Sequence, residues 1–130
     1  MKTRVILVVA SLVSLLLMTV HLTQDTIYQA DGSMQYPIPV VFLAVWLYAT
    51  VMGADRIWGY VVMLLGGLLS VGMIVIHANG ITVRKTGGLE DVWTLFALST
   101  TGWLLIALSA RELGLAIRSR RAGPPNPSDV

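Results

Sequence analysis

The chain contains no cysteine and very little charge. Only 12% of its 130 residues are Asp, Glu, Lys or Arg, whereas a soluble domain has about 25%. The missing cysteines exclude disulfides, thiol nucleophiles and thiolate metal sites. The shortage of charge argues against an ordinary water-soluble domain, because too few side chains are available to cover its surface with groups that water solvates.

Long hydrophobic runs take the place of the missing charge, and hydrophobic residues make up 55% of the chain. Asp, Glu, Lys and Arg do not occur within residues 5–23, 34–54, 57–83 or 92–110. Charge is costly inside hydrocarbon, so such segregation is typical of a protein that crosses a membrane several times. We place four spans in these runs, at about residues 5–22, 38–54, 57–78 and 92–110.

Each run is close to the roughly 20 residues that a helix needs to cross the hydrocarbon core. The spans should be helical, because a backbone surrounded by lipid must satisfy its own hydrogen bonds. The first run begins with the basic residues of "MKTR", as a signal peptide would. Its apolar core is longer than usual, however, and no A-x-A-like cleavage site follows, so we expect an uncleaved span. The predicted fold is all-α, a polytopic membrane protein forming a four-transmembrane-helix antiparallel bundle.

The distribution of basic residues predicts the orientation. With a cytoplasmic N-terminus, seven of the nine basic residues lie inside, and only Arg84 and Lys85 lie outside. The seven are Lys2, Arg4, Arg56, Arg111, Arg118, Arg120 and Arg121. This bias follows the positive-inside rule, so we expect both termini in the cytoplasm. We expect the chain in the cell membrane, and its general character suggests a bacterial inner membrane.

The basic residues beside the spans also explain the net charge of +2 without a nucleic-acid partner. Residues 1–112 form the predicted transmembrane domain. Residues 113–130 are basic and rich in proline, with too little apolar surface to fold. We expect them to form a disordered cytoplasmic tail near anionic headgroups.

Small and polar residues recur at helical spacing within the runs and predict packed helix faces. Gly66 and Ser70 form a small-xxx-small pair, which lets two helices approach closely. The predicted packing residues are Ser11, Ser14, Gly59, Gly66, Ser70, Ala97 and Thr101. Trp46 and Trp103 lie near the middle of their runs, away from the usual interfacial belt of aromatic residues. We expect both to be packing residues; the alternative is an aromatic-lined cavity for a lipid or quinone.

Both histidines of the chain lie near the outer ends of predicted spans, where acidic residues also occur. In "MTVHLTQD", His21 and Asp25 share one helix face, and His77 and Glu90 are expected at similar depth. Such a set could bind a divalent metal through His21, His77 and Asp25, ligate a haem, or exchange protons. The plainer interpretation is that these residues are interfacial, and that Glu90 complements a helix dipole.

No complete catalytic constellation is present, so we expect a protein that is not an enzyme. The leading hypothesis is a small membrane scaffold or accessory subunit that acts through helix packing, as a homo-oligomer or within a larger membrane complex. The alternative is a metal-, haem- or proton-responsive binding or transport module at the outer mouth. No cofactor is predicted under the leading hypothesis, and the lipid bilayer is the one partner expected under both.

Overall fold

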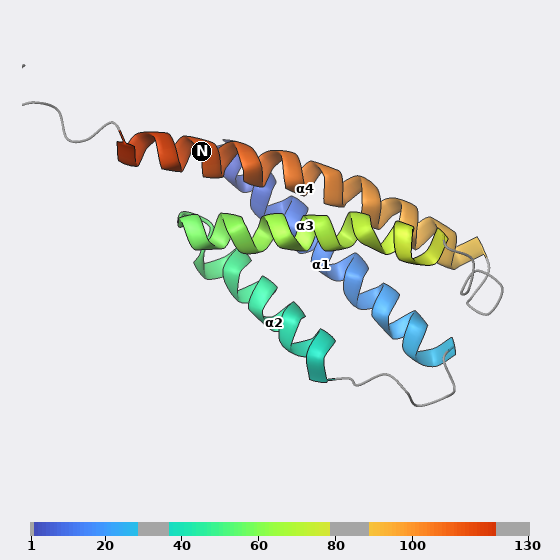
Figure 1. Ribbon diagram of the computed structural model, residues 1–130. Helices are drawn as coiled ribbons and strands as arrows, with labels where there is room; N and C mark the ends of the chain where they lie inside the picture. The colour runs from blue at the N-terminus through green and yellow to red at the C-terminus, as the bar shows by residue number, and fades with distance from the viewer. Residues whose placement is uncertain (1, 29–36, 79–88, 122–130) are drawn as a thin grey trace, which may run out of the picture.

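A computed structural model describes residues 2–28, 37–78 and 89–121, and all three ranges are helical apart from one tight turn. The helices are α1 (Lys2–Tyr28), α2 (Pro37–Met52), α3 (Ile57–Ala78) and α4 (Leu89–Arg121) (Figure 1). The prediction of an all-helical protein is therefore confirmed for the residues that the structure describes. No residue in these ranges is part of a β-strand.

The helix boundaries differ from the predicted spans mainly at the ends of α1 and α4. Helix α3 covers the predicted residues 57–78, whereas α1 and α4 continue several residues past the apolar runs. Hydrophobicity marks the part of a helix that can lie in lipid, but it does not mark where the hydrogen-bonded helix ends. Residues 113–121, which the sequence analysis assigned to a disordered tail, belong to α4. Its last turn carries Arg118, Arg120 and Arg121, and such cations stabilise a helix C-terminus.

Three of the helices are long and apolar enough to cross a membrane. These stretches are Thr3–Gln24 in α1, Ile57–Val75 in α3 and Val92–Arg121 in α4. Helix α2 is as apolar but has only 16 residues, or about 24 Å at 1.5 Å per residue. Large hydrophobic side chains such as Leu16, Val45 and Phe96 are at least half exposed. Lipid is the environment in which such a surface is stable.

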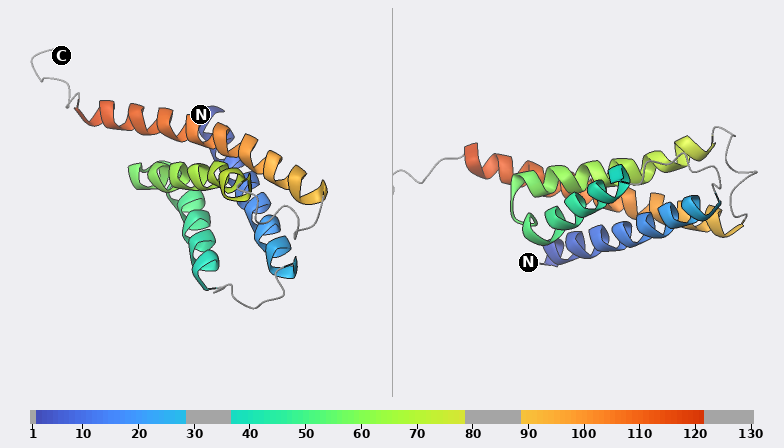
Figure 2. Two further views of the ribbon diagram at one scale, coloured as in Figure 1. Left: turned by 45° about the vertical axis from the view of Figure 1, so that its right-hand side comes forward. Right: turned by 90° about the horizontal axis from the view of Figure 1, so that it is seen from below.

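Helices α3 and α4 lie side by side and form the most extensive contact of the fold (Figure 1). Helix α1 packs chiefly on α4, and α2 contacts α3 and α1. The start of α2 lies away from the α3–α4 pair, as Figure 1 and the left view of Figure 2 show. The last turns of α4 extend beyond the beginning of α3. The core is formed where the helices cross, by Leu7, Leu15, Met18, Trp46, Tyr60, Met63, Leu98 and Leu105.

Hydroxyl side chains in the helices bond mostly to their own backbone. Thr19 donates to the carbonyl of Leu15 at 2.8 Å, and Ser70 donates to the carbonyl of Gly66 at 2.9 Å. Thr100 repeats this pattern with the carbonyl of Phe96. A hydroxyl that is satisfied within its own helix can be placed in an apolar environment without a partner elsewhere.

Candidate functional site

A closed ring of hydrogen bonds joins α1 to α2 in the middle of the fold. The indole Nε1–H of Trp46 donates to Ser11 Oγ at 3.0 Å, and the Ser11 and Thr50 hydroxyls are 2.7 Å apart. The Thr50 hydroxyl donates to the Trp46 carbonyl at 2.9 Å. Since each hydroxyl carries a single proton, Ser11 must donate to Thr50. All three side chains are fully buried, and every polar hydrogen in the ring has an acceptor.

Gly66 of α3 provides the space in which the Trp46 ring lies. A Cβ atom at Gly66 would overlap Cε2 of the indole and would lie 2.7 Å from Cδ2. Trp46 is fully buried and Phe42 packs edge-on against it, with ring centroids 5.8 Å apart. The indole therefore links three helices, since α2 carries it, α1 bonds its N–H and α3 gives it room.

The seam between α3 and α4 depends on two other glycines. A Cβ at Gly67 would lie 3.0 Å from the Gly102 carbonyl oxygen, and a Cβ at Gly102 would lie 3.0 Å from the Gly67 carbonyl oxygen. The added Cβ at Gly102 would also lie 2.9 Å from the Cβ of Ser70. The two backbones are thus in direct contact, which is how small residues let membrane helices gain dispersion energy.

The turn between α2 and α3 also rests on a pair of glycines. The Gly53 carbonyl accepts the Arg56 N–H at 2.9 Å, and the Gly53 N–H donates to the Ala49 carbonyl at 2.9 Å. The Gly53 carbonyl oxygen occupies the place that a Cβ on Gly59 would take. Neither glycine can gain a side chain without moving the backbone of the turn.

Charged residues gather at the end of the fold where α1 begins. Arg4 forms an ion pair with Asp55 of the α2–α3 turn. Arg111 of α4 donates to Thr3 at 3.2 Å and to Glu112 at 3.1 Å. The start of α1, the end of α2 and the Arg111 region of α4 therefore lie at one end, which we name the charged end.

Three polar side chains on the face of α1 that carries His21 are buried. Ser11, Ser14 and His21 are 0% exposed and Met18 is 1% exposed. Ser11 belongs to the hydrogen-bonded ring, whereas the Ser14 hydroxyl has no hydrogen-bond partner among the described residues. This side of α1 consequently faces protein along about three turns, from Ser11 to His21.

Of the four candidate ligand or proton-transfer residues, the structure places the side chain of one. His21 lies inside the fold near the end of α1 that is opposite the charged end. Asp25, His77 and Glu90 fall within α1, α3 and α4 by their backbone, but their side chains lie outside the described part. Among the described side chains, no three His, Asp or Glu residues come together as a metal site. The predicted ligand set therefore stays a prediction.

The other predicted packing residues have varied surroundings. Thr101 is half-buried and donates to the carbonyls of Ala97, at 3.0 Å, and Leu98, at 3.1 Å, of its own helix. Ala97 is half-buried as well. Trp103 was expected to pack like Trp46, but its side chain is 61% exposed. That expectation was wrong within this chain, because Trp103 lies on the face of α4 that points away from α1 and α3.

Sequence reasoning missed Gly67 and Gly102, although both interrupt runs of large apolar residues. A glycine within a membrane helix is itself a signal of close helix approach, and this signal could have identified both. The partners of each glycine could not have been assigned, since spacing gives the face of a helix but not its neighbour.

No family model matches the sequence, and no curated protein or solved structure shows significant similarity to it.

Proposed function

We propose that the chain is an integral membrane protein with four crossings and cytoplasmic termini, and that it acts as a non-enzymatic scaffold or accessory subunit through helix packing. The observation that carries this proposal is the contrast between a polar, hydrogen-bonded centre of the fold and its apolar outer faces. The buried polar groups of the central ring bond to one another, while the outward faces are covered by large apolar side chains.

The contacts at the charged end support four crossings, one more than the three helices that are long enough by themselves. The Arg4–Asp55 pair places the start of α1 beside the turn that precedes α3. If α1 and α3 both cross the bilayer from that end, the chain between them must return across it. Helix α2 is the helix available for the return, and although it is short, a mismatch of a few ångströms can be absorbed by local thinning of the bilayer.

The orientation that we propose follows from the charge of this end. Arg4, Arg56 and Arg111 lie at the charged end together with Asp55 and Glu112. Arg118, Arg120 and Arg121 continue in the same direction on the last turn of α4. Basic residues next to spans mark the cytoplasmic side, so this end, with both termini, faces the cytoplasm of the cell membrane.

The scaffold role is supported by what the buried polar groups do. The hydroxyls of Ser11 and Thr50 and the indole N–H of Trp46 are all used in holding α1 and α2 together. Trp93, Phe96 and Trp103 form an outward aromatic face on α4. Aromatic residues are enriched where proteins meet other proteins, and they supply the contact area that a membrane partner would bury.

Photocrosslinking from each helix tests the scaffold role. A photoreactive residue is placed at one outward position per helix, at Leu16, Val45, Leu65 or Trp103, which are 64%, 50%, 53% and 61% exposed. Fully buried Leu98 is the control position. We expect a defined protein adduct from at least one outward position in native membranes and none from Leu98. Adducts to lipid alone from all four outward positions would contradict the scaffold role.

A further inference from the structure

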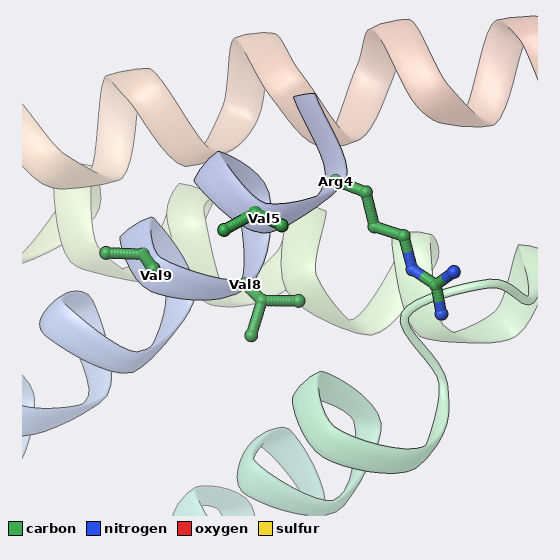
Figure 3. A pocket seen from close by; sticks show the side chains of 4 residues that line it. All are labelled: Arg4, Val5, Val8 and Val9. Carbon is green, nitrogen blue, oxygen red and sulfur yellow. The ribbon is translucent and has the colours of Figure 1, made fainter. Parts of the chain in front are cut away.

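An open groove follows the outer face of α1 from the charged end toward the middle of the fold. Its first part has a volume of about 290 Å³ and is lined by Arg4, Val5, Val8 and Val9 (Figure 3). Its second part, of about 250 Å³, lies between α1 and α2. The second part is lined by Leu12, Leu15, Leu16 and Thr19 of α1 and by Leu43, Ala44 and Leu47 of α2.

Both parts of the groove belong to one side of α1. With 100° per residue, the eight α1 residues that line them fall within an arc of about 140°. The buried residues Ser14, Met18 and His21 lie on the other side of the helix. The two parts are separate hollows that follow one another along this side of α1, and apart from Arg4 and Thr19 all of their lining residues are apolar.

The mouth of the groove is basic. The Arg4 side chain is 51% exposed and points to the α2–α3 turn (Figure 3). Arg56 follows Asp55 in that turn, and Arg111 bonds to Thr3 one residue before Arg4. An apolar groove that begins at Arg4, with Arg56 and Arg111 at the same end of the fold, matches the two parts of an anionic phospholipid.

We propose that this groove binds one anionic phospholipid, with the phosphate at Arg4 and one acyl chain along Val5, Val9, Leu12 and Leu16. The site rests on the proposed transmembrane arrangement, since it places Arg4 at the headgroup level of the cytoplasmic leaflet. From Val5 to Leu15 the helix rises about 15 Å, which is half of the roughly 30 Å hydrocarbon core. The part of the groove assigned to the acyl chain, from Val5 to Leu16, is therefore about as deep as one leaflet.

In the proposed site, the Asp55 carboxylate competes with the lipid phosphate for the Arg4 guanidinium. Both side chains are more than half exposed, and an exposed ion pair of this kind adds little to stability. The guanidinium has five N–H donors, so it can bind a phosphate in exchange for Asp55 or alongside it. Loss of the Asp55 carboxylate should therefore strengthen the binding of the lipid.

Native mass spectrometry of the full chain in mild detergent measures this binding. The protein is mixed with equal amounts of phosphatidylglycerol and phosphatidylcholine that carry the same acyl chains. We expect the wild type to retain one lipid and to prefer phosphatidylglycerol. Arg4→Gln should reduce this preference about fivefold, as expected for one basic residue near the membrane surface. Asp55→Asn should increase it, whereas Arg56→Gln, at the same end but outside the groove, should change it less than Arg4→Gln.

A second pair of variants tests the acyl-chain part of the groove. Ala44→Phe places a ring in the part lined by α1 and α2 and should lower the bound fraction of both lipids. Ala107→Phe makes the same change at an exposed position of α4 and should leave the bound fraction as in the wild type. Circular dichroism of each variant confirms that the helical content is unchanged.

The proposed site is overturned by any of three results. These are equal binding of the two lipids by the wild type, equal losses in Arg4→Gln and Arg56→Gln, or equal effects of the two phenylalanines. If Arg4→Gln does not fold, Asp55→Asn still decides, because an unchanged preference in that variant rejects the role of Arg4. Failure of the membrane proposal has a different signature, namely release of the wild-type protein from vesicles at alkaline pH.

Discussion

Replacing Gly66 by alanine is expected to lower the free energy of unfolding by about 2–3 kcal/mol, the upper part of the range for overpacked cores. The added methyl group would overlap the indole of Trp46, which is held in place by its bond to Ser11. Either the ring or the α3 backbone must move, and both movements break contacts at the centre of the fold. The midpoint of unfolding by SDS in mixed micelles, followed by circular dichroism, measures the change.

Gly72→Ala is the matched control for this substitution. It lies in the same helix, and nothing lies within 4 Å of the added Cβ. The stability of this variant should stay constant or rise by up to about 1 kcal/mol, because alanine is the better helix former. Trp46→Phe in the Gly66→Ala background should recover part of the loss, since it removes ring atoms from the overlap. Additive effects of the two changes would mean that the residues do not pack together.

Gly59→Ala is the second change with a large expected effect, a loss of about 3 kcal/mol or more. The new Cβ would overlap the Gly53 carbonyl, which already accepts the Arg56 N–H. A backbone group held by hydrogen bonds cannot rotate away as a side chain can. The turn must open, and Asp55 would move away from Arg4.

The same unfolding assay measures the effect, with Gly72→Ala again as the control. A cysteine pair at Thr3 and Asp55 gives an independent readout, because the wild-type chain has no other cysteine. Crosslinking of this pair by a short bifunctional reagent should be efficient in the native background and weak with Gly59→Ala. Equal crosslinking and equal stability would show that the turn is looser than the structure indicates.

The sequence predicted the helices far better than their contacts. Charge-free runs located all four helices, because a backbone in apolar surroundings must satisfy its hydrogen bonds within its own segment, as a helix does. The same signal could not place the ends of α1 and α4, where the helices continue into polar sequence. Residues 113–121 looked like a tail by composition, yet they continue α4 beyond the apolar run.

For the central packing site, the sequence predicted which residues lie on a packed helix face, but not which residues of other helices they contact. Helical spacing put Gly66 and Ser70 on one side of α3, and the position of Trp46 within its run predicted a packing residue. It could not show that Gly66 receives the Trp46 ring while Ser70 faces Gly102, because neighbours depend on how the helices cross. The bond from Trp46 to Ser11 was equally out of reach, since it joins residues 35 positions apart.

Cysteine labelling tests the four-crossing arrangement most directly. Ser33→Cys, Thr86→Cys and Ser119→Cys each introduce a single thiol into a chain that has none. In intact spheroplasts, a membrane-impermeant maleimide should label positions 33 and 86, and it should label position 119 only after the membrane is opened. Labelling of position 119 in intact spheroplasts, or protection of position 33, would contradict four crossings with cytoplasmic termini.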